Sequence, residues 1–332
     1  MKILLAKPRG FCAGVDRAID TVKLALEVYG KPLYVKHAIV HNEKVVKDLE
    51  DQGVIFIEAV TEIPKRANVV FSAHGSPPAD YLIAKSRELN LIDATCPLVT
   101  KVHLEAKRFA KEGYRIILVG HKGHIELVGT RGEAPDSTII VESEKDIESL
   151  NFSQAEKIVV LTQTTLSVDD TKGLLDSIKK KYPQVILPPS SDICYATTNR
   201  QRAARPLAEA SDLVLVVGSA ASSNTNRLVD VAKDKGTTTY RINGPEDIQK
   251  KWFKNVKVVG VTSGASAPED LVQKVIDYLR QMGATKVEEL EVMEERVWFD
   301  LPPEIKEAAQ KTGAGHKFID KHTISADSKM SA

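Results

Sequence analysis

Short runs rich in valine and isoleucine alternate with segments of helical period along most of this 332-residue chain. Such alternation predicts an α/β fold with mostly parallel sheets, because a crossover helix must return the chain between parallel strands. The runs expected as strands are Leu33–Val35, Val54–Glu58, Val69–Ser72, Arg115–Val119, Thr138–Val141, Ile158–Thr162, Leu213–Val217, Thr237–Arg241 and Val256–Val261. The clearest helical segments are Glu43–Gln52, Asp169–Lys181, Asn226–Lys235 and Glu269–Met282.

The alternation also repeats at long period, with one cysteine at the start of each third. The chain has three cysteines, each between a strand-like run and a helical segment: Cys12, Cys96 and Cys194. A polar loop follows each cysteine after 29, 28 and 28 residues, at His41, His124 and Ser222. A second polar loop follows later in each third, at His74, Thr164 and Ser266. This pattern predicts three α/β lobes related by a pseudo-threefold axis.

The repeat sets the expected domain boundaries. They are an N-terminal strand and first cysteine loop at 1–13, lobes at 14–96, 97–193 and 194–285, a C-terminal extension at 286–310 and a flexible tail at 311–332. The tail is polar and has no apolar period, so its histidines His316 and His322 are expected to have no catalytic role.

Charge and hydropathy exclude several classes of function. Lys and Arg total 46 against 45 Asp and Glu, a net charge of +1, so nothing indicates nucleic-acid binding. No apolar run approaches the ~20 residues of a membrane span, and the N-terminus lacks a signal-peptide core. The expectation is a cytoplasmic protein with reduced thiols, and a monomer because no long apolar surface helix is evident.

The three cysteines predict a metal centre. An isolated cysteine is more often a small buried hydrophobic residue, but three at equivalent repeat positions would converge near a threefold axis. Helix N-termini favour thiolates, and Cys96-Pro97 is typical of iron–sulfur ligands. Structural zinc usually has four protein ligands. Three ligands therefore favour an iron–sulfur cluster with one iron free for a substrate.

The polar loops predict an anion site, because ligands of open α/β sheets bind beyond the carboxyl ends of strands and phosphates favour helix N-termini. The candidate donors are His41, His74, His124, Ser222, Ser223, Asn224 and Ser266. The serines and Asn224 also suit ordinary helix capping, and Ser266-Ala-Pro-Glu269 has the form of a capping box. Both roles use the same helix end.

One carboxylate and one threonine complete the candidate site. Glu126, two residues after His124, would be a surface residue by default, yet burial near a metal would raise its pKa and suit it to donate a proton. Thr164 could position that proton or a substrate hydroxyl. His37, His103 and His121 are weaker candidates, expected in a strand, on a helix face and in a solvated loop.

Several motifs together resemble one enzyme family. They are Arg9-Gly-Phe-Cys-Ala-Gly-Val, Asp93-Ala-Thr-Cys-Pro-Leu-Val-Thr-Lys, Thr162-Gln-Thr-Thr-Leu-Ser-Val-Asp-Asp, Asp192-Ile-Cys-Tyr-Ala-Thr-Thr-Asn-Arg, Ser222-Ser-Asn and Gly264-Ala-Ser-Ala-Pro. These stretches resemble the 4-hydroxy-3-methylbut-2-enyl diphosphate reductases from Met1 to about Pro303.

The resemblance implies a three-lobed fold around one [4Fe–4S] cluster with three cysteine ligands, Cys12, Cys96 and Cys194. It implies reductive dehydroxylation of an allylic diphosphate to isopentenyl and dimethylallyl diphosphate, the last step of the methylerythritol phosphate pathway, with electrons from ferredoxin or flavodoxin. It further implies that Glu126 donates the proton, that Thr164 contacts the substrate hydroxyl, and that the donors named above bind the diphosphate.

Two positions depart from the family pattern. Ile125 stands where family members often have proline, and Pro206 is expected to kink or end the helix after Cys194. Two other functions use the same residues: a cluster enzyme similar to quinolinate synthase, and an iron–sulfur or zinc sensor.

Overall fold

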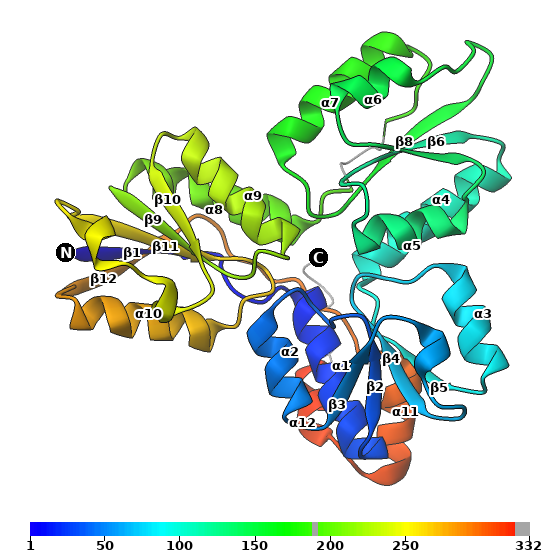
Figure 1. Ribbon diagram of the computed structural model, residues 1–332, viewed down its shortest axis with the longest axis horizontal. Helices are drawn as coiled ribbons and strands as arrows, with labels where there is room; N and C mark the ends of the chain where they lie inside the picture. Colours follow the sequence, from blue (N-terminus) through cyan, green and yellow to red (C-terminus); the bar gives the residue numbers. More distant parts are fainter. Residues whose placement is uncertain (188–191, 323–332) are drawn as a thin grey trace.

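Three separate parallel sheets form three lobes around a common centre in the computed structural model, which describes residues 1–187 and 192–322 (Figure 1). Within these residues every strand pair is parallel. The predicted three-lobed α/β fold is therefore confirmed. No helix in the described part of the chain combines the length and hydropathy needed to span a bilayer.

The first lobe is built on a four-stranded sheet in the order β3-β2-β4-β5. Its strands are β2 (Leu33–Lys36), β3 (Val54–Ile57), β4 (Asn68–Phe71) and β5 (Asn90–Asp93). Its helices are α1 (Ala13–Tyr29), α2 (Glu43–Glu50) and α3 (Pro78–Ser86), with a 3-10 turn at Val60–Glu62. Ala18, Ile19 and Val22 on α1 pack against this sheet, as their 3.6-residue period predicts.

The second lobe has a three-stranded sheet in the order β7-β6-β8. Its strands are β6 (Arg115–Val119), β7 (Thr138–Val141) and β8 (Ile158–Thr162). Its helices are α4 (Pro97–Lys111), α5 (Ile125–Glu133), α6 (Glu144–Ser149) and α7 (Val168–Lys181). All five residues of β8 are buried although β8 lies at the edge of the sheet, where Val159 forms a bridge with Ile186 on its outer side.

The third lobe holds a five-stranded sheet in the order β10-β9-β11-β1-β12. Its strands are β1 (Lys2–Lys7), β9 (Leu213–Val217), β10 (Thr238–Ile242), β11 (Val258–Ser263) and β12 (Lys286–Glu291). Its helices are α8 (Tyr195–Glu209), α9 (Ser223–Asp234) and α10 (Glu269–Gln281), with 3-10 turns at Pro245–Asp247 and Lys250–Phe253. The N-terminal strand thus lies inside the third lobe, between β11 and β12.

The C-terminal segment differs from the expected flexible tail. Helix α11 (Pro303–Thr312) and helix α12 (His316–Lys321) lie beside α1 (Figure 1). Phe318, within the expected tail, is buried in the core of the first lobe together with Ile305 and Ala309 of the C-terminal extension. Residues 323–332, the rest of that expected tail, lie outside the described residues.

Helix α8 continues past Pro206, which was expected to kink or end it. Pro206 lies in the last turn, where the backbone N–H of Ala210 still donates to the Pro206 carbonyl at 3.1 Å. The Pro206 ring removes one N–H donor from α8, and the helix nevertheless continues to Glu209.

Candidate functional site

A central cavity of about 100 Å³ receives residues from all three lobes. Its walls include every residue predicted for the site: Cys12, His41, His74, Cys96, His124, Glu126, Thr164, Cys194, Ser222, Ser223, Asn224 and Ser266. Most of these residues follow the carboxyl end of a parallel strand or begin a helix, which is where open α/β sheets bind ligands. Thr165, which the sequence placed in the same loop as Thr164, also lines the cavity, and so does Thr197, which was not predicted.

The three cysteines occupy equivalent positions at helix starts. Cys12, Cys96 and Cys194 are the residues immediately before α1, α4 and α8, and each is a free thiol. A Cβ atom added to Gly14 would lie 2.6 Å from Cys96 Sγ and 3.9 Å from Cys12 Sγ. Two lobes therefore bring their thiols to one place, and glycine leaves the space that both sulfur atoms need.

The helix N-termini were expected to lower the pKa values of the thiols, but the pKa values of Cys96 and Cys194 are raised. Burial raises the pKa of Cys96 to about 12, and the charge of Cys12 adds to this, although backbone N–H groups of Leu98 and Val99 oppose it. Burial likewise raises the pKa of Cys194 to about 11, against hydrogen bonds from Thr197. Buried thiolates this close together need a cation to balance their charge, so the donor set fits a thiolate-bound metal cluster.

The histidine tautomer at position 124 is set by the backbone. His124 Nδ1 accepts a hydrogen bond from the Glu126 backbone N–H at 3.2 Å, so its proton lies on Nε2 in the neutral ring. Nε2 is buried and has no partner among the described residues. A buried N–H without an acceptor is costly, and an anionic ligand would supply that acceptor.

His41 and His74 lie next to each other in the same wall, with ring centroids 4.1 Å apart. Burial lowers the pKa of His41 to about 4, with further lowering by His124 and His37. Burial also lowers the pKa of His74 well below its usual value and the pKa of His124 to about 4. These rings are neutral at pH 7, so they can contact an anion as hydrogen-bond donors rather than as cations.

Ser266 links the third lobe to the first, whereas Ser222 and Asn224 form hydrogen bonds within the third lobe. Ser222 caps α9 and accepts from the Thr225 N–H at 3.3 Å. Ser266 was expected to cap the next helix, but α10 begins after Pro268, and the Ser266 hydroxyl instead donates to the His41 carbonyl at 3.1 Å. Asn224 is fixed by the Ala265 N–H, which donates to its Oδ1 at 2.9 Å.

Glu126 is buried in the first turn of α5 and points to the β8 loop. Its Oε2 accepts from the Thr164 hydroxyl at 2.8 Å and from the Thr164 backbone N–H at 3.1 Å. Burial raises the pKa of Glu126, although both bonds from Thr164 oppose this. A carboxyl of raised pKa, held in place inside a cavity, is suited to donate a proton.

The remaining histidines lie in three different environments. His37 follows β2 with a φ of 60°, and its ring lies beside His41 and His74 rather than in a strand as expected. His103 is buried on α4, and Cβ atoms added to Gly75 or Gly129 would lie 3.0 or 2.9 Å from its Cε1. The location of His37 four residues before His41 was the signal that sequence reasoning passed over.

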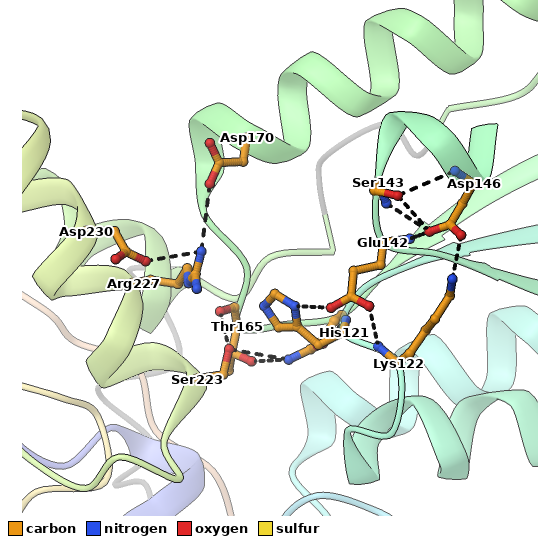
Figure 2. Close-up of polar contacts among 11 residues, drawn as sticks. His121, Lys122, Glu142, Ser143, Asp146, Thr165, Asp170, Ser223, Arg227 and Asp230 are labelled. Carbon is orange, nitrogen blue, oxygen red and sulfur yellow. Dashed lines mark hydrogen bonds and ion pairs between the residues drawn. The ribbon is translucent and has the colours of Figure 1, made fainter. Parts of the chain in front are cut away.

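His121 lies at the junction of the second and third lobes, where its Nδ1 is 3.0 Å from Glu142 (Figure 2). Arg227 on α9 reaches across this junction to Asp170 at 3.8 Å and also contacts Asp230 on its own helix (Figure 2). Ser223 donates to the Thr165 carbonyl at 3.0 Å. Polar contacts thus join the cavity loops of these two lobes.

Comparison with known proteins matches the geometry. Residues 3–280 match the family described as LytB protein. The 4-hydroxy-3-methylbut-2-enyl diphosphate reductase of Protochlamydia amoebophila is 52% identical over 308 residues, 93% of this chain and 98% of its own. The reductase of the same name from Haemophilus influenzae (strain PittGG) is 50% identical over 309 residues, 92% and 98% of the two chains.

A solved structure agrees with these sequence relatives. The E-1-hydroxy-2-methyl-but-2-enyl-4-diphosphate reductase of Plasmodium falciparum superposes with a TM-score of 0.92 at 41% identity, covering 94% of this chain and 99% of that chain. This chain therefore belongs to the LytB family of 4-hydroxy-3-methylbut-2-enyl diphosphate reductases, which are oxidoreductases.

Proposed function

We propose that this protein reductively removes the hydroxyl group of (E)-4-hydroxy-3-methylbut-2-enyl diphosphate and yields isopentenyl and dimethylallyl diphosphate, the last step of the methylerythritol phosphate pathway. The proposal rests on the residues that line one cavity. They are three thiols, a ring of neutral hydrogen-bond donors, and a buried carboxyl held by Thr164. The names of the close relatives supply the substrate.

Cys12, Cys96 and Cys194 would hold the cofactor, a [4Fe–4S] cluster with three protein ligands. The raised thiol pKa values and the space over Gly14 support this donor set. Such a cluster supplies electrons one at a time and, at the iron without a protein ligand, a Lewis acid for the leaving oxygen. Ferredoxin or flavodoxin would deliver the electrons, because each carries one electron per encounter.

The ring of donors would bind and orient the diphosphate. His124 offers a buried N–H with no acceptor among the described residues. Ser222, Ser223 and Asn224 lie at the start of α9, and Ser266 lines the same cavity. His41 and His74 would complete the ring from the first lobe. Anchoring one end of a short substrate fixes the position of its hydroxyl end, which lowers the entropic cost of reaction.

Glu126 and Thr164 would act at the hydroxyl end. The C–O bond breaks, two electrons and two protons are consumed, and water leaves with the proton from Glu126. The second proton goes to either end of the allylic system, which accounts for two products. The Thr164 hydroxyl donates a hydrogen bond to Glu126 Oε2 and so holds the carboxyl that supplies the proton in place.

An anaerobic assay with dithionite and a redox mediator tests this proposal. Consumption of the allylic diphosphate that depends on the reductant, with both products formed, is the expected result. Consumption of a different substrate without net reduction would instead indicate chemistry similar to quinolinate synthase. Glu126→Gln should keep its iron and lose about 10²–10⁴-fold in turnover. A metal sensor needs no proton donor, so its function should not change in this variant. Turnover by Glu126→Gln at the level of the unaltered protein would contradict the proton-donor role.

A further inference from the structure

Arg17 is a buried cation close to the cysteine site, and the proposed reaction does not use it. It lies on α1, which begins near the centre of the molecule (Figure 1), and it is only 8% exposed. Its Nη1 donates to the Thr95 carbonyl at 3.0 Å, and its Nε donates to the Asp300 carbonyl at 2.6 Å. The guanidinium therefore contacts the residue directly before Cys96.

The geometry of α1 places this charge beside a thiol. A Cβ atom added to Gly14 would lie 2.6 Å from Cys96 Sγ, so this face of α1 meets that sulfur atom. Arg17 is three residues further along, and residues three apart share one helix face. Helical side chains also lean toward the N-terminus of their helix, which is the direction of Gly14. The hydrogen bond to the Thr95 carbonyl fixes the guanidinium in this position.

Arg17 forms no ion pair among the described residues, unlike the other lysine and arginine side chains that are buried there. Lys36 pairs with Asp80, and Arg200 pairs with Glu295 at 3.0 Å. The acceptors of Arg17 are two uncharged carbonyl groups. A buried charge is costly unless an opposite charge compensates it, so Arg17 requires an anion nearby.

Cys96 is the group that best supplies this anion. Burial lowers the pKa of Arg17, and the charge of Cys96 opposes this more strongly than the carboxylates of Asp93, Glu304 and Asp300 do. A cysteine that binds metal is a thiolate, so Cys96 would carry its charge while it holds the cofactor. The guanidinium stays protonated in proteins, so both charges would be permanent.

We propose that Arg17 compensates the negative charge of the cysteine-bound cofactor and thereby raises its reduction potential. This inference rests on the proposed function, because it requires the cluster held by the three cysteines. Net charge is one of the factors that set the potential of an iron–sulfur cluster. Reduction adds negative charge, which a fixed cation in a buried site favours. Arg17 does not line the central cavity, so it would act through the cofactor and not on the substrate.

The test is a redox titration of the anaerobic, cluster-containing protein, followed by electron paramagnetic resonance. Arg17→Gln removes the charge and keeps an amide that can donate to a carbonyl. Its midpoint potential should be lower than that of the unaltered protein by at least about 59 mV, which is a tenfold change in the equilibrium for one electron. An unchanged potential in a variant that holds the full cluster would overturn the proposal.

Arg17→Lys separates the charge from the hydrogen bonds. Lysine keeps the charge but lacks the planar fork of donors, so both variants should lower the midpoint of thermal unfolding. Only Arg17→Gln should lower the potential, since a purely structural role gives no reason for that difference. A potential in Arg17→Lys that falls by about 59 mV or more would overturn the proposal. This comparison with the unaltered protein holds even if Arg17→Gln retains too little cluster for a titration.

Arg108→Gln is the matched control, because Arg108 is an exposed arginine on α4 that lines the same surface pocket as Arg17. Solvent screens its charge, so its loss should leave the potential unchanged. Equal falls in Arg108→Gln and Arg17→Gln would overturn the proposal, because the net charge of the protein would then explain both.

Failure of this inference differs from failure of the proposed function. An unaltered protein without an iron–sulfur signal would contradict the proposed cofactor and, with it, the role of Arg17. Equal potentials in cluster-containing variants would contradict the role of Arg17 alone.

Discussion

The Thr164 hydroxyl donates a 2.8 Å hydrogen bond to the Glu126 carboxyl across the floor of the central cavity. The bond joins the first turn of α5 to the loop after β8, so two strands of one sheet position the group. It also favours the ionised carboxylate and thus opposes the effect of burial on the Glu126 pKa.

Replacing Thr164 should change the pH dependence of turnover. Thr164→Val removes the hydroxyl bond, so the Glu126 pKa should rise further. A proton donor works while it is protonated, so the pH at which turnover falls off should move upward. Thr164→Ser keeps a hydroxyl and should stay close to the unaltered protein. The measurement is kcat against pH for all three proteins, and a downward shift in Thr164→Val would contradict the assignment.

Filling the space at Gly14 should impair cofactor binding. Gly14→Ala would place a methyl group 2.6 Å from Cys96 Sγ, and overpacking of this kind costs about 1–3 kcal/mol. We expect lower iron content per chain and a weaker cluster absorbance in anaerobically purified protein. Gly173→Ala on α7 is the control, because nothing lies within 4 Å of its added Cβ. Helical alanine should stabilise that variant by about 0.5–1 kcal/mol, and equal iron in both variants would contradict a cluster at this point.

Removing Arg200 should destabilise the junction of the Cys12 loop with α8. Arg200 is completely buried, donates to the Gly10 carbonyl at 2.8 Å and pairs with Glu295 at 3.0 Å. Arg200→Met leaves both partners unsatisfied, and breaking a buried pair costs about 3–5 kcal/mol. Arg205→Met on the same helix removes a more exposed pair with Asp169 and should cost less than about 1 kcal/mol. Thermal or urea unfolding measures both, and similar losses would be inconsistent with this role.

Asp20 should make the docking of α12 sensitive to acid. Burial alone would raise the Asp20 pKa, but hydrogen bonds from His322 and Lys321 outweigh burial and hold it below its usual value. A lowered pKa in the folded state contributes stability above the unfolded value of about 3.9, and this contribution is lost as the pH falls through the folded value.

The corresponding variant is Asp20→Asn. It should lose about 1–3 kcal/mol of unfolding free energy at pH 7 and should show a smaller further loss below pH 4 than the unaltered protein. Asp48→Asn is the control, because the Asp48 side chain forms an exposed pair with Lys44. Unfolding by urea at several pH values measures the difference. A parallel pH dependence in the unaltered and Asp20→Asn proteins would rule out this contribution.

The sequence predicted the lobes and the cavity walls because both depend on local patterns that repeat. Strand ends and helix starts bring chemically distinctive residues to one edge of each sheet, so Cys96 and His124 could be placed before any contact was known. The family resemblance supplied the reaction, which no periodicity contains.

Properties that depend on burial could not be predicted in the same way. The thiol pKa of Cys96 is raised because the lobes enclose it, whereas the helix start alone favours a lower value. The Ser266 hydroxyl donates to the His41 carbonyl of the first lobe rather than capping α10. This hydrogen bond depends on how the two lobes pack together, which a local sequence pattern does not contain. The docking of α12 involves contacts between residues far apart in the chain, such as His322 with Asp20 and the buried Phe318 with the core of the first lobe.

The position of β1 fixes the order in which this molecule can be completed during synthesis. Lys2 pairs with Val258 on one side and with Lys286 on the other, so the first strand has no permanent neighbours until nearly the whole chain has left the ribosome. Closing loops over such sequence separations is slow, and until it happens the backbone groups on both edges of β1 are unpaired. Cys12 lies between this strand and α1, so the loop that carries the first thiol is held from its third-lobe side only once β11 and β12 have paired with β1.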